Sequence, residues 1–315
     1  MSEVISKATR LGYAEGLCEL GKTHEDMVVL DADLAGATMT CQFKKEFPER
    51  FVDCGIAEQN MMSIAAGLAA TGKLTFASSF AMFAAGRAFE QVRNSIGYPH
   101  LPVKIGATHA GISVGEDGAT HQCNEDIALM RTIPGMTIIN PADAVEAKAA
   151  VIAAAEIDGP VYMRFGRFAV PVFNDEADYK FEVGKAVVLK EGTDVSIIAT
   201  GLLVNEARIA GEMLEKEGIS AEIINVHTIK PLDTNTILAS IGKTGCAVVA
   251  EEHSIIGGLS SAVCEALCDT KPAPVVRVGI NDEFGMSGSA AELLKHYGLS
   301  AENLVAKAKE AINRK

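Results

Sequence analysis

The stretch from residue 108 to residue 122 carries the densest group of side chains that could do chemistry. His109 and His121 bracket it, three glycines divide it, and Asp117 lies within it. An imidazole can take up and release protons near neutral pH, and a carboxylate can accept hydrogen bonds from hydroxyl groups of a substrate. Glycines permit the positive φ angles and close backbone approaches that shaped loops need. The residue types leave two interpretations open: a ligand-binding loop, or a glycine-rich surface turn with two solvated histidines.

The elements that flank this loop predict where it lies. An apolar run over 101–107 predicts a buried parallel strand, and a helical segment is expected to begin near residue 124. In open α/β sheets, ligands bind outside the carboxyl ends of the strands. The polar side chains of the loop are therefore expected at the edge of the sheet where ligand sites form.

Glu58 is a second candidate, because it opens an alanine-rich helix that is expected to run to about residue 71. A carboxylate in this position commonly does no more than interact with the positive end of the helix dipole. The alternative is a carboxyl group that shares a proton with a ring nitrogen of a ligand. The residues around Glu58 do not by themselves decide between the two.

Strands and helices alternate regularly through the first half of the chain, which predicts a doubly wound, mainly parallel sheet. Phe80 and Phe83 are three residues apart in a predicted helix, so they are expected to share a helix face, as core residues often do. The predicted strands cover 27–30, 51–53, 74–78, 101–107, 137–139 and 161–164, and the main helices cover 7–20, 58–71, 80–95 and 143–155.

The second half repeats this alternation after a linker with an acidic patch. We therefore predict an α/β protein of two doubly wound domains, residues 1–170 and 184–315, joined by a linker at 171–183. Residues 251–253, Glu-Glu-His, are expected to form a solvated strand end. The predicted strands are 195–199, 221–226, 247–250 and 275–278, and the predicted helices are 203–217, 234–241, 260–267 and 290–297.

Composition narrows the class of protein. The 315 residues carry a net charge of −13, which argues against nucleic-acid or anionic-membrane binding as a main role. No apolar run reaches the length of a membrane span. The seven cysteines include no Cys-x-x-Cys pair, which fits reduced thiols and an expected cytoplasmic location. Because the chain as a whole is acidic, a site for an anionic ligand would need several lysine or arginine side chains close together.

Four segments of the chain resemble the transketolase family, in the family's order. They are Gly-Ile-Ala-Glu-Gln-Asn at 55–60, Ser-Phe-Ala-Met-Phe at 79–83, the loop at 108–122, and Phe-Gly-Met-Ser-Gly at 284–288. The resemblance covers the pyrimidine-binding and C-terminal domains of a full transketolase. The Gly-Asp-Gly…Asn signature by which the family's front domain binds metal and diphosphate does not occur. The chain thus resembles the C-terminal subunit of a split transketolase.

The resemblance implies thiamine diphosphate as cofactor. Glu58 matches the glutamate that hydrogen-bonds the aminopyrimidine nitrogen, Phe83 matches the ring that stacks on the pyrimidine, and Phe80 lies beside it. Glu58, His109 and His121 are the catalytic residues that the family implies. No metal ligand is expected in this chain, and Mg²⁺ or Ca²⁺ is expected on a partner subunit.

The family also implies a site for sugar phosphates. The matching residues are Arg10, His109, Asp117, His121 and Arg164, with Arg167 as an alternative to Arg164. A guanidinium fork suits phosphate oxygens. The implied reaction moves a two-carbon ketol unit from a ketose phosphate to an aldose phosphate. It would take place only in a heterotetramer with an N-terminal, diphosphate-binding subunit.

Two positions depart from the family, and other functions stay open. Ala37 replaces a phosphate-binding serine, and Gly86 replaces a tyrosine of the pyrimidine pocket. A deoxyxylulose-phosphate synthase fragment and the β subunit of a 2-oxo-acid dehydrogenase share the fold, but they lack the pairing of His109 with Asp117. A non-catalytic regulatory module is the alternative from another class.

Overall fold

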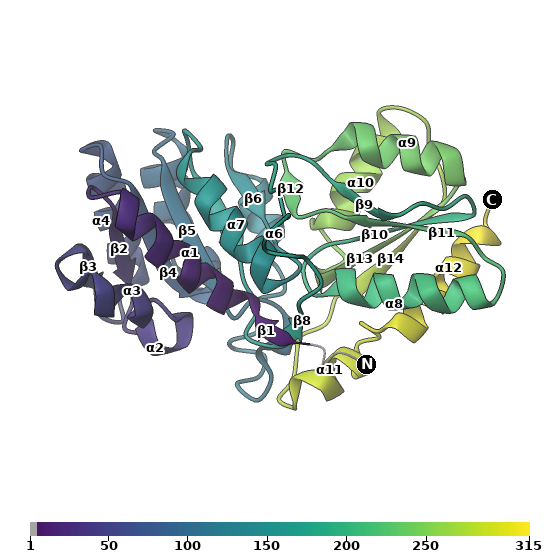
Figure 1. Cartoon of the computed structure of the whole chain (residues 1–315), viewed down its shortest axis with the longest axis horizontal. Helices are drawn as coiled ribbons and strands as arrows, with labels where there is room; N and C mark the ends of the chain where they lie inside the picture. The colour runs from purple at the N-terminus through teal and green to yellow at the C-terminus, as the bar shows by residue number, and fades with distance from the viewer. Residues whose placement is uncertain (1–4) are drawn as a thin grey trace.

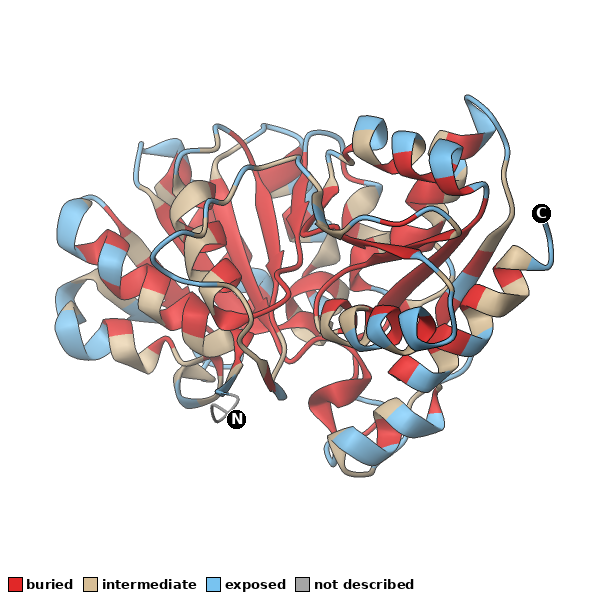
Figure 2. Cartoon of the chain, turned by 45° about the vertical axis from the view of Figure 1, so that its right-hand side comes forward, coloured by how far each residue is buried: buried red, intermediate tan, exposed pale blue. Residues whose placement is uncertain are grey.

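The computed structural model describes residues 5–315, which form two α/β domains that lie side by side (Figure 1). The first domain contains a seven-stranded sheet and the second a five-stranded sheet, each with helices packed on it. The central strands of both sheets are buried, while the outer faces of the helices are exposed (Figure 2). The prediction of an α/β fold with two such domains is confirmed.

The first domain follows the predicted alternation. Its sheet contains β2 (Val28–Asp31), β3 (Phe51–Asp53), β4 (Thr75–Phe80), β5 (Val103–Thr108), β6 (Thr137–Ile139) and β7 (Val161–Arg164). Its helices include α1 (Thr9–Thr23), α2 (Ala35–Thr38), α3 (Cys41–Glu46), η1 (Pro48–Arg50), α4 (Glu58–Ala70), η4 (Ile112–Val114), α6 (Asp126–Arg131) and α7 (Ala144–Ala155). Two short strands that the sequence does not signal, β1 (Ser6–Ala8) and β8 (Ala169–Pro171), pair antiparallel outside the main sheet.

The second domain contains the four predicted strands and one more. Its strands are β9 (Val187–Lys190), β10 (Val195–Ala199), β11 (Ala221–Asn225), β13 (Ala247–Ser254) and β14 (Val275–Ile280), in the spatial order β14-β13-β10-β11-β9. Its helices are α8 (Leu203–Lys216), α9 (Thr234–Thr244), α10 (Leu259–Cys268), α11 (Ala290–His296) and α12 (Ala301–Ile312). Only β9 runs antiparallel to its neighbour among the described strands of this sheet.

One strand from the second half belongs to the sheet of the first domain. β12 (Thr228–Lys230) pairs antiparallel with β6, so the first sheet has the order β12-β6-β7-β5-β4-β2-β3. β12 covers an edge that would otherwise expose unpaired backbone groups. The two domains are therefore joined by strand pairing as well as by the linker.

β4 and β5 position the site. Every residue of both strands is buried, as expected for parallel strands with helices on both faces. They are parallel neighbours in a register that sets Phe80 beside Thr108. Their carboxyl ends therefore bring the segments after residues 80 and 108 to the same edge of the sheet.

The prediction of one helix over 80–95 is wrong. Phe80 is the last residue of β4, and the following segment consists of two π-helical stretches, η2 (Met82–Arg87) and η3 (Val92–Gly97), with α5 (Phe89–Gln91) between them. Phe80 and Phe83 thus belong to different elements rather than to one helix face. π-Helical turns are rare and occur frequently at functional sites.

Close packing of α1 on α7 fixes the start of α1, where Arg10 lies. A Cβ atom on Gly12 would lie 2.1 Å from the backbone oxygen of Ala144, so only glycine permits this approach. Gly16 makes a similar approach to Val151. The two helices lie together on one face of the first sheet (Figure 1).

No helix in residues 5–315 combines the length and apolar character needed to cross a membrane.

Candidate functional site

Phe80 and His109 form the base of the candidate site. Phe80 ends β4, His109 follows β5, and their rings stack with centroids 3.9 Å apart at 25°. Both side chains are largely buried. His109 has a φ of +55°, a backbone conformation that is uncommon for residues other than glycine and is concentrated at functional sites.

The hydrogen bonds of His109 define its tautomer. Nη1 of Arg10 lies 3.3 Å from Nε2 of His109, and Oγ1 of Thr108 lies 3.0 Å from Nδ1. Because arginine only donates, Nε2 accepts, so Nδ1 carries the hydrogen in the neutral ring. Burial, with Arg10 and Arg167 nearby, lowers the pKa of His109 to about 3. His109 is therefore a neutral residue at physiological pH.

His121 and Phe83 complete the aromatic part of the site. The ring of His121 lies T-shaped to Phe83, with centroids 5.4 Å apart, and 6.3 Å from Phe80. Nδ1 of His121 lies 2.9 Å from Oγ1 of Thr120, which orients the ring. Four of the predicted side chains, Phe80, Phe83, His109 and His121, are thus brought together from two segments of the chain, 79–83 and 108–122.

Arg10 and Arg167 supply positive charge at this edge. Arg10 donates to the carbonyl of Ala37 at 2.7 Å, and burial together with the nearby Arg167 lowers its pKa. Arg167 donates to the carbonyl of Val114 at 2.6 Å and lies 3.9 Å from the carboxylate of Asp117. Two guanidinium groups that repel each other beside a neutral histidine favour an anionic ligand.

The structure does not bring Arg164 to this cluster. Its side chain is buried, and its Nε donates to Asp126 at 2.8 Å while Nη2 donates to the carbonyl of Glu252 at 2.8 Å. Burial holds this guanidinium between groups of both domains, away from solvent. Of the two alternative arginines, Arg167 rather than Arg164 lies near Arg10, and a phosphate-binding role for either stays a prediction.

Glu58 lies at the start of α4 as predicted, but its partner was not predicted. Nη1 of Arg87 donates to Oε2 of Glu58 at 2.7 Å, and the guanidinium carbon of Arg87 lies 4.6 Å above the ring of Phe83. The side chain of Glu58 is 2% exposed and that of Arg87 is 48% exposed. No sequence signal marked Arg87, because it lies in a segment that was expected to be an ordinary helix.

The second domain holds the loop of the site through Glu252. The carboxylate of Glu252 accepts the backbone N–H of Ser113 at 2.5 Å, and burial raises the pKa of Glu252 to about 7. A Cβ on Gly111 would lie 2.4 Å from that carboxyl carbon, so glycine is required there. Gln122 also reaches across, since its Nε2 donates to the carbonyl of Met286 at 2.9 Å.

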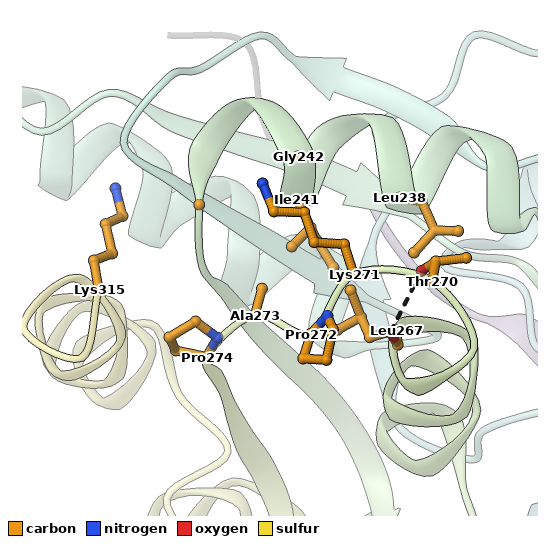
Figure 3. A pocket seen from close by; sticks show the side chains of 11 residues that line it. Leu238, Ile241, Gly242, Leu267, Thr270, Lys271, Pro272, Ala273, Pro274 and Lys315 are labelled. Atoms are coloured by element: carbon orange, nitrogen blue, oxygen red, sulfur yellow. Dashed lines mark hydrogen bonds between the residues drawn. The ribbon is translucent and has the colours of Figure 1, made fainter.

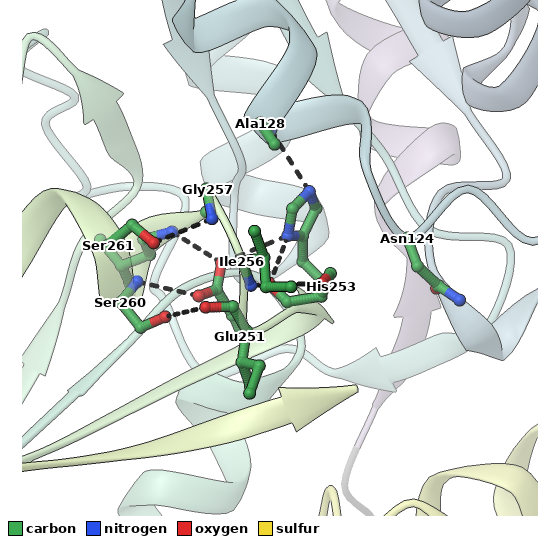
Figure 4. Close-up of polar contacts among 12 residues, drawn as sticks. Asn124, Ala128, Glu251, His253, Ile256, Gly257, Ser260 and Ser261 are labelled. Atoms are coloured by element: carbon green, nitrogen blue, oxygen red, sulfur yellow. Dashed lines mark hydrogen bonds and ion pairs between the residues drawn. The ribbon is translucent and has the colours of Figure 1, made fainter. Parts of the chain in front are cut away.

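Residues 251–253 are buried, so the prediction of a solvated strand end is wrong. Figure 4 shows the carboxylate of Glu251 facing the start of α10, where it accepts the backbone N–H groups of Leu259 and Ser260. His253 donates from Nδ1 to its neighbour's carbonyl and accepts the N–H of Ala128 at Nε2. These hydrogen bonds satisfy Glu251 and His253 within the fold, which explains how both side chains can be buried.

Two cavities of about 380 Å³ differ in their relation to the site. One lies in the second domain between α9, α10 and the start of β14, with Lys271 and Lys315 at its rim (Figure 3). It shares no residue with the aromatic cluster. The other is lined by Met82, Thr120 and Phe284 and therefore adjoins the site. No group of three or more potential metal ligands occurs in the part of the chain that the structure describes.

Comparison with known proteins agrees with this geometry. A family model described as the transketolase pyrimidine-binding domain matches residues 6–172, and one described as the transketolase C-terminal domain matches 184–304. A transketolase C-terminal section from Methanocaldococcus jannaschii is 52% identical over 98% of both chains. A 6-deoxy-6-sulfo-D-fructose transketolase subunit from Clostridium sp. (strain MSTE9) is 44% identical over 96% of this chain and 94% of the relative. A solved structure described as a split gene transketolase, inactive beta4 tetramer, has a TM-score of 0.90 and 51% identity, and the match covers 98% of this chain and 99% of that one.

The fold and site therefore define an α/β protein with a pyrimidine-binding domain. The chain belongs to the transketolase family. Within the family it corresponds, over nearly its whole length, to the C-terminal section of a split transketolase.

Proposed function

We propose that this chain is the pyrimidine-binding subunit of a split, thiamine diphosphate-dependent transketolase. It transfers a two-carbon ketol unit from a ketose phosphate to an aldose phosphate, together with a diphosphate-binding partner. The observation that carries the proposal is the convergence of Glu58, Phe83, His109 and His121 with two arginines at one sheet edge.

The residues present fit the pyrimidine end of the cofactor. A buried carboxylate suits a protonated ring nitrogen, and an exposed aromatic face suits a planar heterocycle. The hydroxyl of Ser79, which precedes Phe80 in β4, is buried and has no hydrogen-bond partner. A planar cation, the guanidinium of Arg87, already lies against both Glu58 and Phe83.

We assign the diphosphate end of the cofactor to a second chain. Residues 5–315 contain no metal-ligand cluster, and the sequence lacks the Gly-Asp-Gly…Asn signature. The similar solved protein is described as an inactive tetramer of β chains, which supports the need for a partner. We therefore propose that Mg²⁺ or Ca²⁺ and the diphosphate are bound by an N-terminal subunit in a heterotetramer.

Each side chain of the site has a proposed role. When bound, thiamine diphosphate supplies the nucleophilic carbon for breaking and forming the carbon–carbon bond. Glu58 holds a proton at the pyrimidine nitrogen, and Phe83 with Phe80 fixes the plane of the ring. His109 and His121 hold and move protons at substrate hydroxyl and carbonyl groups, since both imidazoles line the same aromatic wall.

Charge distribution points to a sugar with an anionic tail. Because His109 is neutral, Arg10 and Arg167 supply the positive charge, and Asp117 orients substrate hydroxyls. The Clostridium relative is named for a sulfonated sugar, which is also an anionic sugar. We propose a sugar phosphate for this chain, and we propose that it works in the cytoplasm.

The test is a donor assay with the chain reconstituted with its diphosphate-binding partner. Xylulose 5-phosphate should act as a donor and pyruvate should not, whereas a 2-oxo-acid dehydrogenase or a deoxyxylulose-phosphate synthase would use pyruvate. Turnover of xylulose 5-phosphate should require added thiamine diphosphate. No turnover of any ketose phosphate by a fully loaded complex would overturn the proposal.

A further inference from the structure

Arg87 covers the two side chains, Glu58 and Phe83, that are proposed to contact the pyrimidine ring. Its guanidinium donates to Oε2 of Glu58 at 2.7 Å and lies 4.6 Å over the ring of Phe83. Glu58 and Phe83 are the two residues that are proposed above to contact the pyrimidine. A guanidinium is planar and cationic, as a protonated aminopyrimidine is, so both groups satisfy the same carboxylate and the same aromatic face.

Glu58 depends on Arg87 in the free chain. Its side chain is 2% exposed, and within residues 5–315 its carboxylate accepts a hydrogen bond from no other group. A buried carboxylate without a partner is costly. Arg87 thus stabilises the free subunit by covering Glu58 and supplying its hydrogen-bond partner.

The position of Arg87 allows it to leave. It is the last residue of η2, its side chain is 48% exposed, and Gly86 precedes it. Its guanidinium lies against the ring of Phe83 rather than in the core. A long side chain at a solvent-facing helix end can turn to other rotamers without moving the core.

We propose that Arg87 is a displaceable cap of the pyrimidine pocket. It covers Phe83 and pairs with Glu58 in the free subunit, and it turns away when the aminopyrimidine binds. The proposal rests on the proposed function, since it takes Glu58 and Phe83 as the cofactor's contacts. Its consequence is that cofactor affinity in the complex is reduced by the contacts of Arg87 that binding breaks.

The test is calorimetric titration of thiamine diphosphate into the reconstituted complex, with Arg87→Met compared with the unchanged chain. Methionine keeps an unbranched apolar side chain but removes the charge and the planar group. A half-exposed ion pair and a cation–π contact each contribute modestly, so the dissociation constant should fall about tenfold. Arg87→Lys keeps a cation for Glu58 but loses the planar contact, and should give a smaller gain.

Two controls separate displacement from a general effect of charge. Arg93→Met removes an exposed arginine whose side chain bonds only Asn94 among the described residues, and should leave cofactor affinity unchanged. In the free subunit, Arg87→Met should lower the melting temperature, because it leaves Glu58 buried without its partner. Adding Glu58→Gln to Arg87→Met should restore most of that loss.

The possible results distinguish the two proposals. Weaker or equal cofactor binding by Arg87→Met, with Arg93→Met unchanged, would mean that Arg87 does not compete for the pocket, and would overturn the inference alone. If the unchanged complex does not bind thiamine diphosphate at all, the proposed function itself is wrong. If Arg87→Met does not fold, Arg87→Lys takes its place: tighter cofactor binding than in the unchanged complex supports the inference, and equal or weaker binding overturns it.

Discussion

Glu252→Gln should make the chain more stable at alkaline pH, although it removes a hydrogen-bonded charge. Glu252 is buried between the domains, where its carboxylate accepts the N–H of Ser113. Burial, opposed by the charge of Arg164 and the bond from Ser113, raises its pKa from 4.5 to about 7. The folded chain therefore retains a proton on Glu252 at pH values where the unfolded chain has lost it.

The sign of the effect follows from linkage. Between pH 4.5 and 7 the native state binds more protons at Glu252, so the free energy of unfolding falls as pH rises and the contribution is lost above pH 7. The loss from this residue amounts to about 3 kcal/mol, since one pKa unit corresponds to about 1.4 kcal/mol. Glutamine cannot ionise, so the Gln variant should not lose this stability.

The assay is urea unfolding of the subunit at pH 5 and at pH 8. At pH 5 the variant and the unchanged chain should have similar free energies of unfolding. At pH 8 the variant should be more stable by about 2–3 kcal/mol. The matched control is Glu212→Gln, an exposed change on α8, which should alter stability by less than about 0.5 kcal/mol at either pH. A variant that is less stable than the unchanged chain at pH 8 would refute the reasoning.

Four further predictions concern the site and its support. In the reconstituted complex, Arg167→Met should lower kcat/KM for a ketose phosphate by about 10- to 100-fold, as expected for loss of a charge-assisted contact. The same change should have little effect on a neutral ketose. Equal losses for both substrates would contradict a phosphate-binding role for Arg167. Burial and two arginines lower the pKa of His109 to about 3, so between pH 6.5 and 4 the unfolded chain binds a proton at His109 that the folded chain does not, and the free energy of unfolding falls as pH falls. His109→Gln should therefore reduce this loss of stability, measured by urea unfolding. An unchanged pH profile in the variant would contradict the prediction. Gly12→Ala should destabilise the chain by about 2 kcal/mol or more, because its Cβ would lie 2.1 Å from the backbone oxygen of Ala144. By contrast, Gly67→Ala in α4, with nothing within 4 Å, should stabilise it by up to about 1 kcal/mol in thermal unfolding.

Buried parallel strands were the part of the fold that sequence predicted best. β7 and β10 have the predicted bounds, and β5 differs from its prediction by two residues at the start and one at the end. A strand buried on both faces is mostly apolar over its whole length, and such a run is visible in sequence. β12 was missed because its partner, β6, lies about 90 residues earlier in the chain.

The candidate site was predicted where a local motif defined it. Phe80, Phe83, His109 and His121 lie in segments that resemble a family, and the structure brings them together. Their catalytic and binding roles stay predictions until they are tested. The choice between Arg164 and Arg167 could not be made from sequence, because it depends on Asp126 and Glu252, which reach Arg164 only in the folded chain.

Arg87 and Glu252 were missed for related physical reasons. The π-helical turn of η2 sets the guanidinium of Arg87 on Phe83 and against Glu58, and no residue pattern in 82–87 announced that turn. Glu252 is one carboxylate of an acidic pair that resembles a solvated strand end, and only domain packing buries it. Contacts between distant segments carry no local signal.

The most direct measurement is a crystal structure of the reconstituted two-subunit complex with thiamine diphosphate bound. We predict that the carboxylate of Glu58 lies about 3 Å from the pyrimidine ring nitrogen, with Phe83 against the ring and the diphosphate held by the other subunit. A coenzyme bound with its pyrimidine ring on the order of 10 Å or more from Glu58, well beyond hydrogen-bond distance, would contradict the central claim.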